Sequence, residues 1–421
     1  MKRNRLLAFV LCICMLLTFI PAALAEKTVT ELQVLTYNDD FYDTVIADFE
    51  RLNPDIKIVR KLGQGIDTGA TTAMLTGEDA PDVLMVNSGP GRVLPLAKAG
   101  LLEDLTPYYA SRGWDQTINP SIIDIMKKND DKVWEICNGM DVFSVYYHVP
   151  VFEKLGLTPP KTFEDFEKIC AALKDSGITP LVIGGRDNYQ LGWAMGNFFQ
   201  SIAGKDFVSG LIYGDTKFTE APFQEAQNKF LSFYDNGYIN SDVVAIGGEE
   251  AFTCFAVQQA AMVFSGQGNL QAFFDDGTLD INQVSSFPFP SLRGDEAIPT
   301  AGMAHSWVVN KNTQKMEYAL RFMDYVASLD YQICLGGMSA WKYGIGAIKV
   351  DDLSVLKLNP IVNNAFTQLQ NGVGFNPSVY LPGNLKTVYY ATNQELFTKT
   401  KTPEQIAAEL QKAKEEYLAS K

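Results

Sequence analysis

Strand-like and helix-like patterns alternate along the first ninety residues, and this alternation constrains the fold more than any other feature. Residues 32–37 form an apolar strand pattern, and residues 41–52 carry apolar side chains at helical spacing after a polar Asn-Asp-Asp stretch. Asn53-Pro54 ends that helix, residues 56–62 alternate as a second strand, and PDVLMVN at 81–87 is typical of a buried strand. Because such alternation builds sheets with helices on both faces, it predicts an α/β fold with mostly parallel strands.

The ends of these predicted strands carry polar and aromatic side chains. Tyr37, Asn38 and Asp39 follow the first strand, and Asn87 closes the third. In open parallel sheets, ligands bind in the crevice beyond the carboxyl ends of the strands. We therefore expect these four residues near a binding site.

The first 25 residues have the composition of a secretory signal peptide. Three basic residues stand in the first five positions, residues 6–20 are apolar, and Ala23-Leu24-Ala25 fits the small-residue cleavage pattern. Cys12 and Cys14 lie inside the apolar run, so neither is recognised as a lipid-anchor cysteine. We expect an exported protein, periplasmic or extracellular at the cell surface, with residues 1–25 removed.

The charge balance limits the partners. Acidic residues exceed basic ones, 49 to 35, and removal of three basic residues would shift the formal net charge from −14 to −17. An acidic body repels phosphate backbones, so we expect no nucleic acid partner. It also argues weakly against an anionic ligand and fits a neutral or cationic one.

No motif in the chain indicates a cofactor, a metal site or a catalytic nucleophile. The two histidines, His148 and His305, stand in no metal-binding spacing, and no phosphate-binding glycine loop or serine-nucleophile motif occurs. Outside the signal peptide there are four cysteines without a CxxC spacing: Cys137, Cys170, Cys254 and Cys334. We favour free thiols, although export also permits disulfides.

The rest of the chain continues the alternation of strands and helices. Thr162 with Asp165 marks a helix start before an apolar stripe, and Thr402 with Pro403 marks another. Strand patterns occupy residues 142–147, 178–185, 260–266 and 305–310, and helix patterns occupy residues 163–176, 249–259 and 316–328.

Aromatic and amide side chains recur at the ends of predicted strands. Sugars suit such a lining, because their C–H faces pack on aromatic rings and their hydroxyls pair with amides and carboxylates. The residues of this kind are Tyr37, Asn38, Tyr189, Trp193, Gln267, Asn269 and Trp341.

Four segments, taken in order, resemble the extracellular solute-binding proteins of bacterial ATP-driven importers, in the carbohydrate-binding group related to maltose-binding protein. These segments are MLTGEDAPDVLMVN, VFSVYYHVPVFEKLGLTPPKTFEDFEKICAALKDSGITPL, EAFTCFAVQQAAMVFSG and AGMAHSWVVNKNTQKMEYALRFMDYV. No one of them is diagnostic, but their order and spacing are specific and cover nearly all of the chain after the signal peptide.

The resemblance implies a two-lobed periplasmic-binding-protein fold. Each lobe would have a central, mostly parallel sheet flanked by helices, with the ligand cleft at the hinge. The first lobe would comprise residues 26–140 and about 303–345, and the second residues 141–302 and about 346–421. Such proteins close around the ligand by hinge motion, act as monomers, dock on membrane permease subunits and catalyse nothing.

The resemblance also implies contacts for individual residues. Tyr37, Asn38 and Asp39 match the first ligand-binding loop, and Asn87, with Ser88, matches the loop after the third strand. These positions remain open to structural roles, such as Tyr37 in the core at a strand end.

Four further positions come from later segments. Asp141 matches an acidic residue at the first lobe crossing, Tyr189 replaces a tryptophan, and His305 lies at the late crossing strand, where a structural role is also open. Gly268 stands where the family commonly has another tryptophan, which argues against a long linear oligosaccharide.

Two tryptophans are candidates to replace the lost stacking platform. Trp193 follows Tyr189 closely, and Trp341 lies near the end of the later part of the first lobe. Trp193 could equally be a buried helix residue beside Phe198 and Phe199, which we expect to face the core.

The sequence thus predicts a substrate-binding receptor of an ATP-driven importer that captures a sugar or short oligosaccharide. One alternative is a receptor of the same fold that binds a polyol, a polyamine or a small peptide. For a cationic ligand, Asp39, Asp141 and Asp187 are the candidate carboxylates. Others are an exported carbohydrate-active enzyme, since a carboxylate pair suffices for glycoside hydrolysis, and a sensory receptor partner.

Overall fold

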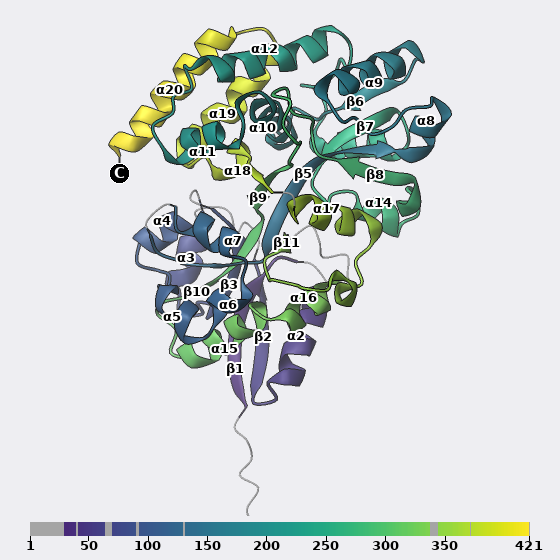
Figure 1. Cartoon of the computed structure of the whole chain (residues 1–421). Helices are drawn as coiled ribbons and strands as arrows, with labels where there is room; N and C mark the ends of the chain where they lie inside the picture. Colours follow the sequence, from purple (N-terminus) through teal and green to yellow (C-terminus); the bar gives the residue numbers. More distant parts are fainter. Residues whose placement is uncertain are drawn as a thin grey trace, which may run out of the picture.

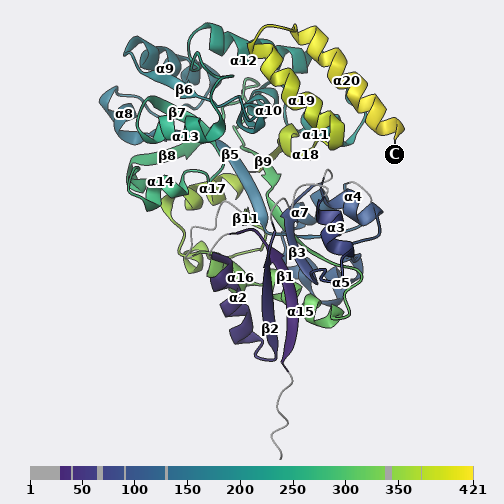
Figure 2. The same ribbon diagram turned by 180° about the vertical axis from the view of Figure 1, so that it is seen from behind.

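The computed structural model describes residues 29–38, 41–63, 70–89, 92–128, 131–336, 344–370 and 372–420. These residues form two lobes joined at a waist (Figure 1), and the view from behind shows the same division (Figure 2). The predicted signal peptide, Asp39 and Trp341 lie outside the described residues. Within them, no helix has both the length and the apolar character needed to cross a membrane.

The first lobe is built on a five-stranded sheet in the order β2-β1-β3-β10-β4. β1 is parallel to β2 and β3, whereas β10 is antiparallel to β3 and β4. Its strands are β1 (Thr30–Thr36), β2 (Ile56–Leu62), β3 (Val83–Asn87), β4 (Ile136–Cys137) and β10 (His305–Val309). Its helices are α2 (Phe41–Leu52), α3 (Ala70–Thr76), α4 (Val93–Lys98), α5 (Thr106–Ser111), α6 (Trp114–Thr117), α7 (Pro120–Met126), α15 (Met316–Val326) and α16 (Leu329–Gly336).

The second lobe is built around the long strand β5. The sheet order is β12-β9-β5-β7-β6, with β8 and β11 also paired to β5. Its strands are β5 (Gly139–His148), β6 (Thr179–Val182), β7 (Ala260–Ser265), β8 (Val284–Phe287), β9 (Thr300–Met303), β11 (Ile345–Gly346) and β12 (Gly374–Phe375).

Helices cover the second sheet on the side away from the first lobe and around its edges (Figure 1). They are α8 (Val149–Lys154), α9 (Phe163–Asp175), α10 (Tyr189–Ala203), α11 (Lys205–Tyr213), α12 (Ala221–Asp235), α13 (Gly248–Ala256), α14 (Gln271–Asp275), α17 (Pro360–Gln370), α18 (Pro377–Tyr380), α19 (Gly383–Phe397) and α20 (Pro403–Ala419), with a short 3₁₀ turn at Ile281–Gln283. Another 3₁₀ turn, Leu353–Leu356, packs against α16 of the first lobe.

The predicted α/β fold with two lobes is confirmed, but the expectation of mostly parallel strands is wrong in detail. β5 is antiparallel to β7, β8, β9 and β11, and only β6 with β7 and β12 with β9 pair in parallel in that sheet. The reason is the crossing at the waist. β5 carries the chain into the second lobe, so strands that lead it back, such as β9, run beside it in the opposite direction.

The crossing strands take part in both cores. Met140 and Val142 at the start of β5 belong to the apolar cluster of the first lobe, whereas Val145 further along belongs to that of the second. Ile345 and Leu356, at and beyond the predicted second boundary, also pack in the first cluster. The chain therefore passes from the first lobe to the second within β5, between Val142 and Val145.

Local sequence signals account for several helices. Thr162 and Asp165 form the predicted capping box of α9, and the residues of its apolar stripe are buried. The stretch GGRDNYQLGWAMGNFF begins as a loop and enters α10 at Tyr189. Phe198 and Phe199 are fully buried, as predicted, in the core of the second lobe.

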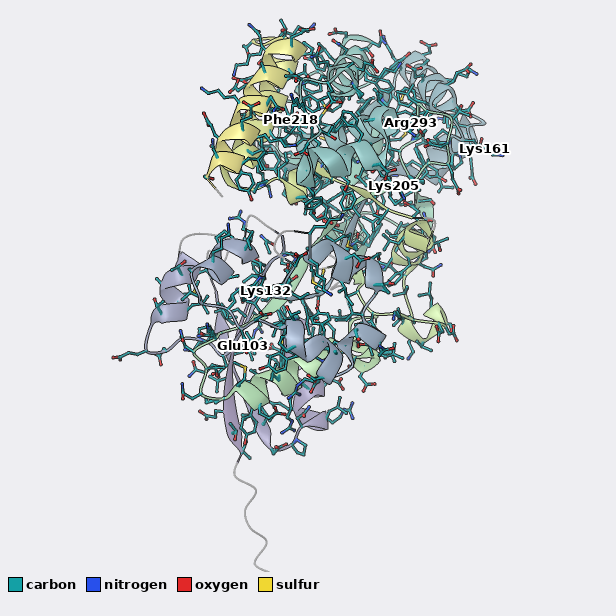
Figure 3. The ribbon with its side chains drawn as sticks, turned by 60° about the vertical axis from the view of Figure 1, so that its left-hand side comes forward. Glu103, Lys132, Lys161, Lys205, Phe218 and Arg293 are labelled. Atoms are coloured by element: carbon teal, nitrogen blue, oxygen red, sulfur yellow. The ribbon has the colours of Figure 1, made fainter. Side chains whose placement is uncertain are left out.

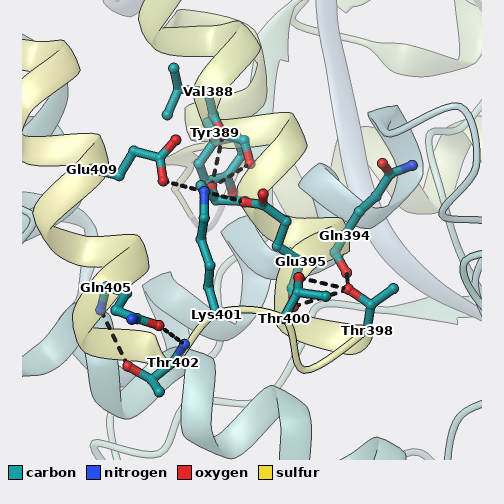
Figure 4. A network of polar contacts seen from close by, with 11 residues as sticks. Val388, Tyr389, Gln394, Glu395, Thr398, Thr400, Lys401, Thr402, Gln405 and Glu409 are labelled. Atoms are coloured by element: carbon teal, nitrogen blue, oxygen red, sulfur yellow. Dashed lines mark hydrogen bonds and ion pairs between the residues drawn. The ribbon is translucent and has the colours of Figure 1, made fainter.

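Charge pairs join the last two helices. Lys401, in the turn between α19 and α20, forms ion pairs with Glu395 at 2.9 Å and with Glu409 (Figure 4). Thr402 and Gln405 form the capping box at the start of α20. The four described cysteines are free thiols, and Cys137 and Cys170 are buried.

Candidate ligand-binding site

A cavity of about 200 Å³ lies between the two lobes at the waist. Its residues come from the ends of β3, β9 and β10, from the start of β5, and from α10, α18 and α19. They are Asn87, Ser88, Arg92, Met303, Ala304 and His305 on the first-lobe side, with Asp141, Phe143, Tyr189, Trp193, Ser378, Val379, Lys386 and Tyr390 at the floor and on the second-lobe side.

The first-lobe side, here called the polar wall, consists of Asn87, Ser88, Arg92 and His305. Asn87 ends β3 and His305 begins β10, and the two are directly paired in the antiparallel register. Their side chains meet at one edge of the sheet because strand ends converge there. The polar wall thus offers amide, hydroxyl, imidazole and guanidinium groups to the cavity.

A buried carboxyl group braces this wall from behind. The Ser88 hydroxyl donates a hydrogen bond of 2.7 Å to Glu135 Oε2. Burial raises the pKa of Glu135, and hydrogen bonds from Ser88 and its surroundings oppose that rise. Glu135 therefore fixes the loop after β3, a role that the sequence did not reveal.

Of the predicted residues after β1, Tyr37 contacts the polar wall without lining the cavity. The Tyr37 ring meets the His305 ring edge to face, with centroids 5.1 Å apart. Tyr37 is half-buried against the first-lobe core, and Asn38 is exposed. Tyr37 is thus placed to orient His305, while Asp39 lies outside the described residues.

Asp141 stands at the floor of the cavity, on the strand that crosses the waist. Burial raises the pKa of its carboxyl group to about 7. None of the hydrogen bonds or ion pairs among the described residues involves this carboxylate. Near neutral pH it is therefore present in both protonation states, able to accept a hydrogen bond or to donate one.

Gly266 makes room for this carboxyl group. A Cβ atom at Gly266 would collide with Asp141 Oδ1 and would lie 3.1 Å from Asn269 Nδ2. The Asn269 amide nitrogen is buried and has no hydrogen-bond partner in the described part of the chain. The Asn269 amide, a hydrogen-bond donor, thus lies beside the Asp141 carboxyl group, although Asn269 does not line the cavity itself.

The second-lobe side, here called the aromatic wall, consists of Phe143, Tyr189, Trp193 and Tyr390. Trp193 stacks on Phe143 with centroids 4.6 Å apart and an interplanar angle of 26°. Tyr189 meets Trp193 edge to face at 4.8 Å. Such a cluster holds each ring in one orientation, which provides a fixed platform for an apolar ligand face.

Close helix packing positions this wall. A Cβ atom at Gly192 would lie 2.7 Å from the Tyr390 ring, so only glycine lets α19 approach α10 so closely. The Tyr389 hydroxyl donates to the Gly192 carbonyl at 3.0 Å, and the Tyr390 hydroxyl donates to the Ser378 carbonyl at 3.2 Å. The glycines of GWAMG thus serve packing rather than chain flexibility.

Two predicted residues use their polar groups elsewhere. Gln267 is buried, accepts a hydrogen bond of 2.8 Å from the Val142 backbone, and braces the crossing strand. Asp187 accepts a hydrogen bond from the Gly248 backbone and lies beside Arg186. Of the two described carboxylates considered for a cationic ligand, Asp141 lines the cavity and Asp187 does not. Asp39 and Trp341 lie outside the described residues.

Eight lining residues escaped the sequence-based prediction: the apolar Phe143, Met303, Ala304 and Val379, and four with polar groups, Arg92, Ser378, Lys386 and Tyr390. The polar four matter most for ligand choice. Arg92 immediately precedes α4, and the other three come from α18 and α19, far along the chain. None follows a recognisable strand, so the strand-end signal could not find them. The NPSVYLPGN segment, with its two prolines and one glycine, was the available hint of an irregular element.

Two other cavities lie within single lobes. One of about 390 Å³ borders Asp82, whose carboxylate accepts from the Gln33 backbone at 2.8 Å and from Thr313. The other, of about 160 Å³, includes Lys205 and Arg293 (labelled in Figure 3). Neither unites the two lobes, and the described residues contain no metal-binding cluster.

Comparison with known proteins identifies the family. Residues 35–333 match the family model of bacterial extracellular solute-binding proteins. The multiple sugar-binding protein of Streptococcus mutans is 21% identical over 332 residues, covering 77% of this chain and 76% of that protein. The melibiose/raffinose/stachyose-binding protein MelE of Bacillus subtilis is 21% identical over 426 residues, covering 96% and 94%.

Solved structures agree in fold. A chitin oligosaccharide binding protein superposes with a TM-score of 0.77 at 21% identity, covering 92% of this chain and 98% of the other. The family consists of binding proteins that act outside the cell rather than of enzymes. The family match, the two-lobed fold and the cavity at the waist lead to one conclusion: the chain belongs to the bacterial extracellular solute-binding proteins.

Proposed function

We propose that the protein is the substrate-binding receptor of an ATP-driven importer and that it captures a sugar or short oligosaccharide. The observation that carries this proposal is the pairing of an aromatic wall with a polar wall across one cavity. A pyranose ring has an apolar C–H face and a rim of hydroxyls, so it matches both walls at once. Relatives named for sugar binding support the same ligand class.

The expected binding mode follows from the geometry. One face of the sugar packs on Trp193 and Tyr189, and its hydroxyls bond to Asp141 and Asn87. Rotation about the crossing strands then brings the polar wall onto the ligand, as in other hinge-closing receptors. The cavity is smaller than the roughly 300–1,000 Å³ of common ligand pockets. Gly268, at a position where the family commonly has a tryptophan, has no ring on which a further sugar unit could stack. Both observations favour a ligand of one or two sugar units.

The remaining parts of this proposal extend beyond the site. The lobes would comprise residues 26–140 with about 303–345, and 141–302 with about 346–421, although the packing of Leu356 favours a later second boundary. The signal peptide would be cleaved after residue 25. The receptor would be a monomer that delivers its ligand to membrane permease subunits and binds no nucleic acid.

A thermal-shift screen tests the ligand class. The purified protein without its predicted signal peptide is melted with mono- and disaccharides, polyols, polyamines and small peptides. A ligand that binds only the folded state stabilises it and so raises the Tm. At a ligand concentration of one hundred times the Kd, the free energy of unfolding increases by about 3 kcal/mol. We expect sugars to raise it. A shift by polyamines or peptides alone would refute the sugar assignment.

A matched pair of variants ties the shift to the cavity. Tyr189→Ala removes a ring from the aromatic wall, whereas Tyr108→Ala removes a tyrosine of α5 that does not line the cavity. We expect only the first to weaken the sugar-induced shift. Equal shifts in both variants would place the ligand elsewhere.

A further inference from the structure

We infer that the ligand is an anionic sugar, one whose charged substituent lies between Arg92 of the first lobe and Lys386 of the second. The inference rests on the proposed function and narrows its substrate class. Sequence composition favoured a neutral or cationic ligand, and the lining of the cavity points the other way.

The local charge is opposite to that of the whole chain. Acidic residues outnumber basic ones 49 to 35 overall. Among the described residues, however, the cavity lining contains two basic side chains, Arg92 and Lys386, and one carboxyl group, Asp141. A cleft with positive groups and low-dielectric walls concentrates anions even on an acidic protein, because nearby charges dominate within about one Debye length, roughly 8–10 Å.

The two cations approach the same aromatic ring from opposite lobes. Lys386 Nζ lies 5.7 Å from the centroid of the Tyr390 ring. Burial raises the pKa of Tyr390 to about 12, and the positive charge of Arg92 partly offsets this rise. The charge of Arg92 therefore acts on the Tyr390 hydroxyl group, and both cations line the cavity together with Tyr390.

Both cations are also held by the protein. Arg92 directly precedes α4, and Lys386 stands in the first turn of the fifteen-residue helix α19. Each makes further contacts with neighbouring groups. They are thus ordered parts of the lining rather than freely moving surface chains, and an ordered cation loses less conformational entropy when it binds an anion.

The other titratable groups around the cavity are compatible with an anion. They are Asp141 on β5, Tyr189 on α10, His305 on β10 and Tyr390 on α19. Burial raises the pKa of Asp141 to about 7 and raises that of Tyr189 above its usual value. Below pH 7 the Asp141 carboxyl group is mostly neutral, so it does not repel a bound anion.

The chemistry of the anion follows from the donors. A guanidinium group presents paired N–H donors that match a planar carboxylate, and an ammonium group adds a compact charge. A uronic acid would place its ring on Trp193 and its carboxylate between the two cations. A sugar phosphate presents the same charge with a different shape, so the experiment separates the two.

Matched ligands test the inference. Isothermal titration compares glucuronate with glucose, galacturonate with galactose, the corresponding disaccharides, and glucose 6-phosphate. We expect the acidic member of at least one pair to bind about ten-fold or more tighter than the neutral one, as charge-assisted hydrogen bonds would give. We also expect this preference to decrease with added salt and as the pH rises above 7.

Matched variants locate the effect. Arg92→Gln and Lys386→Gln should each weaken binding of the acidic sugar about ten-fold more than binding of its neutral partner. The control is Lys205→Gln, which changes the net charge equally but lies at a cavity within the second lobe (Figure 3). It should leave both affinities unchanged.

The outcomes separate this inference from the receptor function. Equal or tighter binding of every neutral sugar, or an unchanged preference in Arg92→Gln and Lys386→Gln, would overturn the anionic ligand and leave the receptor function standing. Binding of no sugar at all would overturn both. A preference for glucose 6-phosphate alone would support the anionic ligand and assign its charge to a phosphoryl group.

Discussion

The aromatic wall of the cleft rests on packed helices, whereas the polar wall rests on strand ends and loops. Trp193 and Tyr390 stand on α10 and α19, which glycine contacts and tyrosine hydrogen bonds hold together. Asn87 and His305 stand where β3 and β10 meet. The aromatic wall is therefore complete within one lobe, and the polar wall acts on the ligand only when the lobes approach each other.

This difference indicates a division of labour. A platform within one lobe can bind the sugar in the open form, where burial of apolar surface gives most of the binding free energy. Hydrogen-bonding groups on the other lobe then select hydroxyl positions and favour closure. Substitutions in the aromatic wall should therefore cost the most affinity, and substitutions in the polar wall less.

The largest effect is expected from Trp193→Ala. It removes the ring that stacks on Phe143 and contacts Tyr189, so a ligand loses its main apolar contact. We expect an affinity loss of about thirty-fold or more, the size typical of a buried aromatic hot spot. Titration of the ligand measures it. Trp193→Phe should recover most of the loss, and unchanged affinity in Trp193→Ala would refute the platform.

The next effect is expected from Gly192→Ala. The added Cβ atom would lie 2.7 Å from the Tyr390 ring, so α10 and α19 must move apart. We expect a stability loss of about 1–3 kcal/mol, as for other overpacked positions, measured by denaturant unfolding. Gly77→Ala on the first lobe is the control, because the nearest atom to its Cβ is 3.6 Å away. If both variants lose the same amount of stability relative to the parent protein, α10 and α19 are not tightly packed at Gly192.

The third effect is the pH dependence of stability that Asp141 causes at the floor of the cavity, between the two walls. The pKa of Asp141 is about 7 in the folded protein, against a usual 3.8. The unfolded chain therefore loses this proton first, and ionisation penalises the folded state increasingly between pH 4 and 7, and fully above pH 7.

Asp141→Asn removes that penalty. We expect it to raise stability by about 1 kcal/mol at pH 8 after allowance for partial exposure, and to have little effect at pH 4. Its Tm is measured against the parent protein from pH 4 to 9. Asp165→Asn in the α9 capping box is the opposite control, since hydrogen bonding lowers the pKa of Asp165. A Tm difference for Asp141→Asn that does not grow with pH would contradict the raised pKa.

The sequence predicts the fold from local signals, and these signals were sufficient where structure is local. The alternation of strands and helices, the capping box at Thr162 and the burial of Phe198 and Phe199 follow from residue spacing. The antiparallel pairing around β5 does not, because it depends on how the chain crosses the waist three times. Periodicity records which face of a strand is buried but not the direction of its neighbour.

The candidate site was predictable to a similar extent. Asn87, Asp141, Tyr189, Trp193 and His305 converge on one cavity. Asn87 ends a strand, Asp141 and His305 stand at strand starts, and Tyr189 and Trp193 lie in the helix after β6. The cations escaped prediction because nothing distinguishes a lysine on an ordinary surface helix from one turned toward a cleft. Gln267 shows the converse, since an amide at a strand end serves the backbone as readily as it serves a ligand.

The smallest effect is expected from Asn87→Ala in the polar wall. Asn87 lines the cavity from the end of β3, and its loss removes one hydrogen bond to the ligand, worth about 1 kcal/mol net, or about five-fold in affinity. Water can reach the open cleft and replace part of that bond. If the walls divide the work as argued, Asn87→Ala should change the order of affinities among sugar epimers more than their mean, whereas Trp193→Ala should weaken all of them alike. A uniform loss in Asn87→Ala would show that both walls bind the sugar in the same way.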